Sequence, residues 1–228
     1  MISVGMDPLV DFLQKQYLQE YIPNGGSKIK FVTGRQGSGK THLAQRIIEN
    51  ADETGYITVY FSAKDVWLHD FKEIYLEILR QCDINTIIRR CADKLVSDMG
   101  YNPDAIEEGK TFIDLLSEKG EADPISRNEI RSWLRSNFTR NPRLDNNFAA
   151  CFMLLTGGII GHLVLEPSSR DMLLAFMAGD KSVKLAQLRA LGLSPSRITK
   201  YNARNLLRSL SEVIHLAGFC GLIVVIDD

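Results

Sequence analysis

The stretch KIKFVTGRQGSGKTHLAQRIIEN, residues 28–50, decides which fold the sequence predicts. Within it, residues 34–41 (GRQGSGKT) fill every fixed position of the pattern GxxxxGK(S/T). Residues 28–33 before the pattern have the β-branched and aromatic content of a strand, and residues 42–50 after it have the apolar spacing of a helix. A strand, a glycine-rich loop and a helix in this order predict a phosphate-binding loop (Walker A) at the start of a parallel α/β sheet.

The loop residues have distinct physical roles toward a bound nucleotide. Glycines adopt backbone conformations closed to other residues and let the chain approach a phosphate closely. Backbone N–H groups and the helix N-terminus face the anionic oxygens, Lys40 adds a cation at the β- and γ-phosphates, and Thr41 offers a hydroxyl to Mg²⁺. We therefore predict ATP and Mg²⁺ as cofactors. The predicted nucleotide-binding residues are Gly34, Gly37, Ser38, Gly39, Lys40, Thr41 and His42.

A second motif, LIVVIDD, occupies residues 222–228. An apolar strand that ends in an acid is typical of Walker B, and its continuous apolar run predicts a strand buried on both faces. Asp227 is predicted to hold Mg²⁺ together with Thr41. Asp228 is predicted to orient or deprotonate the attacking water, so that Lys40 and Asp228 are the candidate catalytic residues.

These motifs predict an α/β chain with the parallel-sheet core of a P-loop NTPase and a large helical insert. The N-terminal helix is expected within residues 1–22, the core within 23–65 and 219–228, and the insert within 66–218. The core is expected to be incomplete on its C-terminal side, because the strands that normally follow such an acid have no counterpart after Asp228. A second strand is expected at 56–62, and helices at 7–21, 71–81, 84–99, 105–118, 126–138, 170–177 and 198–217.

Composition limits the classes of function. The formal charge of −1 argues against a protein that coats nucleic acid by bulk electrostatics, although it leaves room for a local basic patch and for DNA as a partner. No basic region leads into an apolar signal, so the cytoplasm is expected. The cysteines lack metal-ligand spacing and are expected to fill the core. They are Cys82, Cys91, Cys151 and Cys220.

Residues 148–165 contain no charged side chain, which approaches the length of a membrane span. Thr156, Gly157 and Gly158 interrupt the run, and Gly161 would complete a GxxxG pattern. We expect two buried helical pieces joined at the glycines, and no membrane contact.

Two further clusters invite a functional interpretation. His69 and Asp70 precede a predicted helix and could approach the nucleotide, but a helix-cap or surface role is favoured. Arg127, Arg131 and Arg135 share a helical face near Trp133 and Phe138. They could contact nucleic-acid phosphates, but a solvated face beside a core tryptophan is favoured.

The chain resembles the ATP-binding proteins of BREX-type bacterial phage-defence loci, which belong to the AAA+/STAND side of the P-loop superfamily. The resemblance rests on FVTGRQGSGKTHL (31–43), FSAKDVWLHDFKEIYLEILR (61–80) and LRALGLSPSRITKYNARNLLRSLSEVIHLAGFCGLIVVIDD (188–228). It implies a nucleotide-driven switch or motor that acts with DNA-associated partners, either other defence proteins or further copies of the chain.

Three functions therefore compete. The first is an Mg-dependent ATPase, and the second is an ATP-binding scaffold, or a fragment, that needs a partner for catalysis. The third is a small-molecule P-loop kinase, which fits less well because about 160 residues separate the second strand from Walker B.

Overall fold

The computed structural model describes residues 7–227. The chain is a mostly helical α/β protein that divides into two compact units. Unit 1 contains the chain up to Trp67 together with the segment from Phe219 onward, and unit 2 is the continuous segment Leu68–Gly218. Both candidate nucleotide motifs therefore belong to unit 1.

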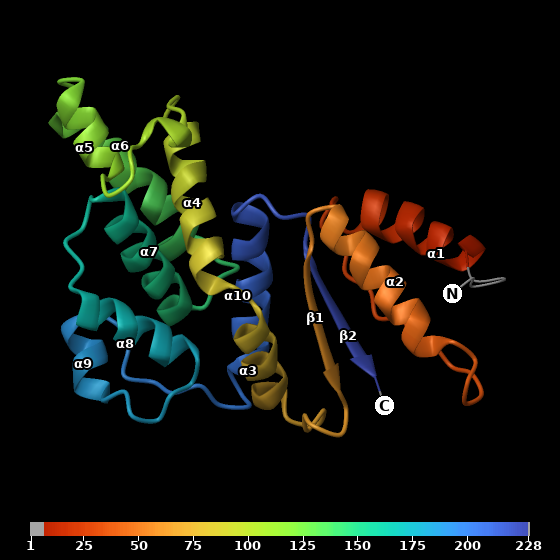
Figure 1. Ribbon diagram of the computed structural model, residues 1–228. Coiled ribbons are helices and arrows are strands. Elements are labelled where there is room, and N and C mark those ends of the chain that lie inside the picture. The colour runs from red at the N-terminus through yellow and green to blue at the C-terminus, as the bar shows by residue number, and fades with distance from the viewer. Residues whose placement is uncertain (1–6, 228) are drawn as a thin grey trace. The chain divides into compact units, whose positions relative to one another are not determined.

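Unit 1 contains a two-stranded parallel sheet of β1 (Ile57–Ser62) and β2 (Leu222–Asp227). The register pairs Ile57 with Leu222 and Ser62 with Asp227. Because the strands are parallel, their carboxyl ends lie at the same end of the sheet, where the N-terminus of helix α2 (Lys40–Glu53) also lies (Figure 1). This arrangement brings the glycine-rich loop to the acidic end of β2.

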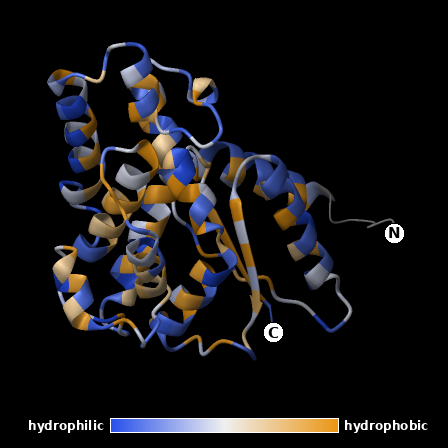
Figure 2. Cartoon of the chain, turned by 60° about the vertical axis from the view of Figure 1, so that its left-hand side comes forward, coloured by the Kyte–Doolittle hydropathy of each residue, from blue (hydrophilic) through white to orange (hydrophobic). Residues whose placement is uncertain are grey.

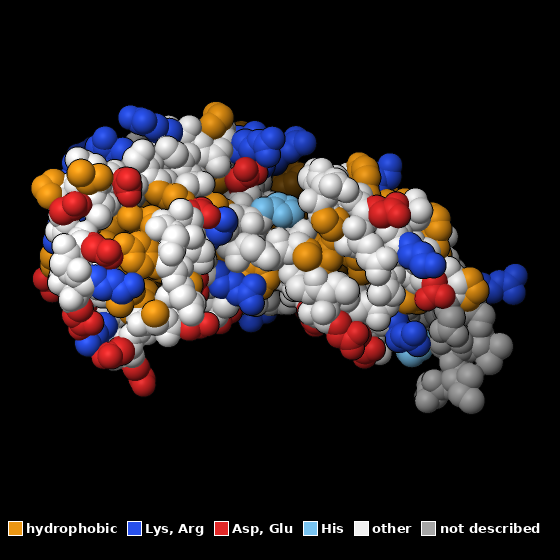
Figure 3. Space-filling view, turned by 90° about the horizontal axis from the view of Figure 1, so that it is seen from above, with side chains coloured by type: hydrophobic (Ala, Val, Ile, Leu, Met, Phe, Trp, Pro, Cys, Tyr) orange, Lys and Arg blue, Asp and Glu red, His pale blue; other side chains and the backbone are white. Residues whose placement is uncertain are grey.

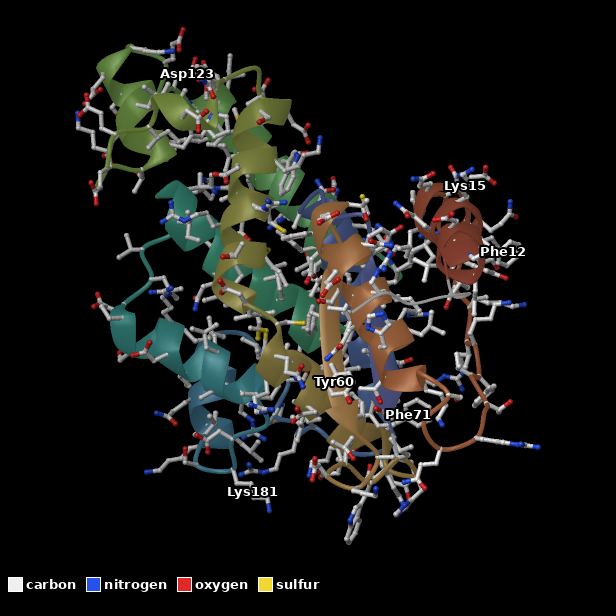
Figure 4. The ribbon with its side chains drawn as sticks, turned by 45° about the vertical axis from the view of Figure 1, so that its right-hand side comes forward. Phe12, Lys15, Tyr60, Phe71, Asp123 and Lys181 are labelled. Carbon is white, nitrogen blue, oxygen red and sulfur yellow. The ribbon has the colours of Figure 1, made fainter. Side chains whose placement is uncertain are left out.

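The predicted N-terminal helix is α1 (Asp7–Leu13) continued by the π-helix η1 (Gln14–Tyr21), which confirms helical structure over 7–21. Leu18 of η1 packs with Ala51 of α2 and with Tyr56 in a buried cluster. The Tyr56 hydroxyl donates to the Leu18 carbonyl oxygen at 2.5 Å, so a buried polar group is satisfied inside this cluster. Phe12 of α1, by contrast, is half exposed (Figure 4).

The predicted strand over 28–33 is wrong, because these residues form neither helix nor strand. Ile29 and Phe31 are 78% and 89% exposed. Side-chain composition favours extended backbone, but a strand also needs a hydrogen-bonded neighbour, and the sheet of the described chain consists of β1 and β2. For the same reason β2 is half-buried rather than buried on both faces, with Ile226 exposed.

Unit 2 is helical, and α7 (Asn146–Ile160) packs against α4, α8 and α10 in its core. Phe148 and Phe152 of α7 stack with ring centroids 4.9 Å apart, and both are buried. Apolar and polar stretches alternate along these helices, as their amphipathic sequences require (Figure 2). The remaining elements are α3 (Phe71–Gln81), α4 (Ile84–Asp98), the 3₁₀ helix η2 (Pro103–Ala105), α5 (Phe112–Glu118), α6 (Pro124–Leu134), the π-helix η3 (Arg135–Thr139), α8 (Pro167–Met177), α9 (Leu185–Ala190) and α10 (Ala203–Leu216).

Local capping sets several of these boundaries. The predicted helix over 105–118 begins only at α5, because Thr111 and Asp114 form a capping box there. The helix expected from residue 198 begins only at Ala203 of α10, after a separate turn in which the Asn202 side chain accepts from the Thr199 N–H at 2.7 Å. Such caps satisfy backbone donors that the first turn leaves unpaired.

The two helical pieces expected around Gly157 and Gly158 are in fact one continuous helix, α7, which ends at Gly161 with φ +79°. A Cβ on Gly157 would lie 2.8 Å from Leu163 Cδ1, and one on Gly158 would lie 3.2 Å from the Leu165 Cβ. Because these glycines have no side chain, Leu163 and Leu165 can pack closely against α7, and the helix continues through both glycines. Among residues 7–227, no helix has the length and apolar character needed to cross a bilayer.

Candidate nucleotide-binding site

The glycine-rich loop has the backbone geometry that a phosphate cradle needs. Gly37 and Gly39 have φ of +77° and +85°, in the left-handed region that glycine adopts without strain. Gly39 is the N-cap of α2, so the first N–H groups of the helix follow the loop directly. A Cβ on Gly34 would lie 2.5 Å from Ser38 Oγ, which shows how tightly the loop closes on itself.

Lys40 is the first residue of α2 and its side chain folds over the loop. Its ammonium donates to the carbonyl oxygens of Gly34 at 3.1 Å and Arg35 at 3.3 Å. The cation is therefore held at the loop that the sequence pattern assigns to the phosphates. His42, in the first turn of the same helix, is half-buried.

Asp227 links the loop to the sheet. Its Oδ2 accepts from the Thr41 hydroxyl at 3.2 Å and from the Tyr60 hydroxyl at 3.0 Å. Thr41 and Asp227 are 186 positions apart in the chain, so only the fold brings them together. Asp228 lies outside the described residues.

Tyr60 is the residue of this cluster that the sequence analysis missed. It lies in β1 near the carboxyl end and is 41% exposed (Figure 4). Its pKa is raised, chiefly by the hydrogen bond to Asp227, so the phenol stays protonated and donates at neutral pH. The sequence did contain a signal for this contact. Tyr60 lies two residues before the end of the second predicted strand, and adjacent parallel strands end side by side, so Tyr60 would lie near the acid that ends the other strand.

The residues present fit a nucleotide with Mg²⁺. A hydroxyl and a carboxylate are the hard oxygen ligands that Mg²⁺ prefers, and this ion usually takes its remaining ligands from phosphates and water. No group of three or more His, Cys, Asp or Glu side chains suited to a metal occurs in the described part of the chain. Thr41 and Asp227 would hold the ion, next to a loop whose glycines leave its backbone open.

Three of the four cysteines are buried. Cys82, Cys91 and Cys151 are buried in unit 2, whereas Cys220 is half-buried in unit 1. Burial raises the pKa of the Cys82 thiol to about 11 and that of Cys91 to about 12, so both stay protonated. The expectation that the thiols fill the core is confirmed for the three buried ones.

Asp70 is a helix cap in unit 2. Its carboxylate accepts from the backbone N–H of Lys72 at 2.9 Å at the start of α3, which confirms the capping role; His69 precedes it. The arginines at 127, 131 and 135 are exposed. Nearby, Trp133 donates to Asp98 Oδ2 at 2.9 Å and meets the buried Phe138 edge-on.

Comparison with protein families assigns the chain over its whole length. The profile of the family described as BREX system ATP-binding protein BrxC/D matches residues 1–228. The chain belongs to this family. Membership confirms the resemblance to BREX ATP-binding proteins and indicates ATP binding within a phage-defence system. Comparisons with curated proteins and with solved structures found no match.

Proposed function

We propose that this BREX-family chain is an Mg-dependent ATPase with a P-loop NTPase core of the AAA+/STAND type. In this proposal it acts as a switch or motor in a DNA-associated defence assembly, together with defence proteins or further copies of itself. The observation that carries the proposal is the 3.2 Å contact between the Thr41 hydroxyl and the Asp227 carboxylate. It joins the two motifs that a P-loop ATPase needs at one metal-binding position.

In this proposal each residue of the site has a separate role in ATP binding or hydrolysis. The loop N–H groups and the Lys40 ammonium bind the phosphates, and Lys40 stabilises the negative charge on the transferred group. Thr41 and Asp227 would hold Mg²⁺, which when bound neutralises phosphate charge. Asp228 orients the attacking water or takes its proton, a role that rests on sequence alone.

The direct test is Lys40→Ala, measured by ATP binding and phosphate release with and without duplex DNA. ATP affinity is expected to fall by at least about 30-fold, because a charge-assisted contact to the phosphates is lost. Lys15→Ala is the matched control, since Lys15 is an exposed lysine of η1 in the same unit (Figure 4). It is expected to bind ATP as the parent chain does.

The outcomes separate the candidate functions. Binding and turnover by the parent, both lost in Lys40→Ala, support the ATPase, and stimulation by DNA supports the DNA-associated role. Binding without turnover supports the alternative, an ATP-binding scaffold that needs a partner for catalysis. A parent chain that binds no ATP overturns the proposal.

Tyr60→Phe tests how Asp227 is positioned. The substitution removes the hydroxyl that donates to Asp227 at 3.0 Å and keeps the ring. We expect the Mg²⁺ concentration for half-maximal turnover to rise about tenfold, while the rate at saturating Mg²⁺ changes little, because partners of metal ligands tune affinity. The control is Tyr21→Phe, whose hydroxyl donates to the Ser27 carbonyl oxygen instead. Equal Mg²⁺ dependence in both variants would show that Tyr60 does not act on the metal ligand.

A further inference from the structure

One segment of unit 2 has a charge unlike that of the rest of the chain. Residues 181–208, here called the basic segment, contain seven Lys or Arg residues, and no Asp or Glu occurs between Asp180 and Glu212. The remaining 20 basic and 28 acidic residues give the rest of the chain a formal charge of −8. The seven residues are Lys181, Lys184, Arg189, Arg197, Lys200, Arg204 and Arg208.

These cations are available to a partner. All seven are exposed, and none forms an ion pair with an acidic side chain of the described residues. Elsewhere in unit 2, basic side chains such as Arg80, Lys94 and Lys110 are paired with carboxylates. On the face that Figure 3 shows, acidic and basic side chains are interspersed, so uniform charge is not general to this surface.

The basic segment is also held in place by buried hydrogen bonds. The side chain of Asn147, which is buried at the start of α7, donates to the Ser194 carbonyl oxygen at 2.9 Å and to Ser196 Oγ at 2.8 Å. Asn147 Oδ1 accepts from the Ser194 N–H at 2.8 Å. Because the loop between α9 and α10 is fixed to the core, its cations are presented in one arrangement and lose less entropy on binding.

Two cations of the basic segment line a recess, and two more lie on α10. Lys181 and Arg197 line a cavity of about 320 Å³ together with Lys72 of α3 and one carboxylate, Asp180. Lys72 also pairs with Glu73, the next residue on α3, at 3.4 Å. Arg197 Nη1 donates to the Lys181 carbonyl oxygen at 3.2 Å, and the Lys181 side chain points away from the ribbon (Figure 4). Arg204 and Arg208 follow at the four-residue spacing that places them on one face of α10.

An exposed aromatic ring lies among these charges. Tyr201 is 83% exposed, and the Lys200 ammonium lies 5.2 Å from its ring centroid. Several exposed cations with an exposed ring among them suit a phosphate backbone and its bases better than they suit a small anion.

We propose that the basic segment, together with Lys72, binds the phosphate backbone of nucleic acid. This proposal rests on the DNA-associated role proposed above, and it identifies the surface that would contact the DNA. All of its residues lie in unit 2, whereas the nucleotide motifs lie in unit 1, so the two proposals can fail separately.

The test compares two triple variants with the same loss of charge. Lys181→Gln/Lys200→Gln/Arg204→Gln removes three exposed cations of the basic segment, and within the described chain none of these three side chains donates a hydrogen bond that the substitution would break. Arg127→Gln/Arg131→Gln/Arg135→Gln removes three exposed cations of α6 and η3 as the control. Binding of a labelled 20-bp duplex and of a single strand is measured by fluorescence anisotropy at several NaCl concentrations. Circular dichroism checks folding.

We expect the first variant to bind duplex at least about tenfold more weakly and to lower the slope of log K against log salt by roughly 2 to 3, since three phosphate contacts are lost. The control is expected to stay within about threefold of the parent on the same scale. Equal weakening in both variants, or no binding by the parent at 50 mM NaCl, overturns the proposal. Displacement of the duplex by poly-glutamate as readily as by unlabelled DNA would also overturn it, in favour of an acidic protein partner.

Measuring ATP binding separates a loss of DNA binding from a failure of the proposed nucleotide site. The first triple variant is expected to bind ATP as the parent does, and Lys40→Ala without nucleotide is expected to keep its DNA affinity. A triple variant that lost both activities would indicate misfolding, which the circular dichroism spectrum would show. Lys72→Gln is then the second variant, expected to weaken DNA binding alone by a few-fold through the loss of one contact.

Discussion

Asp227→Asn is expected to lower Mg²⁺-dependent ATP turnover by roughly 100-fold or more, because a metal-binding carboxylate contributes several kcal/mol of charge stabilisation. Asparagine keeps the shape of the side chain and one acceptor oxygen for Thr41 and Tyr60, which donate to Asp227 at 3.2 and 3.0 Å. The variant should therefore fold. Phosphate release and the ratio of ATP affinities with Mg²⁺ and with EDTA measure the effect.

The matched control is Asp52→Asn, in α2 of the same unit. Asp52 also accepts from a hydroxyl, that of Thr58 at 2.6 Å, but it lies at the opposite end of the helix from Lys40. Its Mg²⁺ dependence is expected to match that of the parent. If Asp227→Asn kept the parent's turnover and its Mg²⁺-enhanced affinity, Asp227 would not be the metal ligand.

Phe152→Ala is expected to lower the free energy of unfolding of unit 2 by about 3 to 5 kcal/mol, which is the cost of truncating a fully buried phenylalanine. Phe152 is 0% exposed in α7, stacks on Phe148 and lies 6.0 Å from Phe138 by ring centroids. The substitution removes the ring contacts with Phe148 of α7 and Phe138 of η3, and it leaves a cavity that packed neighbours fill only in part. Urea denaturation followed by far-ultraviolet circular dichroism measures it.

Ile159→Ala is the control for that experiment, since Ile159 lies on the same helix and is 38% exposed. Its cost is expected to stay below about 1 kcal/mol because its methyl groups already contact water. Similar losses in the two variants would contradict the placement of Phe152 at the centre of the unit 2 core.

Local patterns predicted the glycine-rich loop and the start of α3. The spacing of residues 34–41 was enough to predict a turn that needs left-handed glycines at 37 and 39, since these conformations depend on neighbouring residues alone. A helix-cap or surface role was favoured for Asp70 for the same reason, because a short acceptor directly before an apolar helical repeat satisfies local donors. Family membership supports the ATP binding that this loop predicts.

Features that depend on distant partners were not predictable in this way. Residues 28–33 have strand composition, but composition does not supply the hydrogen-bonded neighbour that makes a strand. Tyr60 contacts Asp227 only because two strands 160 residues apart pair in one register. Gly157 and Gly158 suggested a break, yet the side chains that pack on them come from residues 163 and 165, after the helix has ended.

Unit 1 is made of two chain segments, one before and one after unit 2 in the sequence, and this affects the order in which its parts are synthesised. β1 leaves the ribosome well before β2, and the segment Leu68–Gly218 is translated between them. At ~5–20 residues per second this delay is on the order of 10 s, long enough for a helical domain rich in local contacts to fold first. Nascent chains halted in that interval therefore carry the glycine-rich loop without Asp227, and the proposed metal position is completed only after unit 2 has been made.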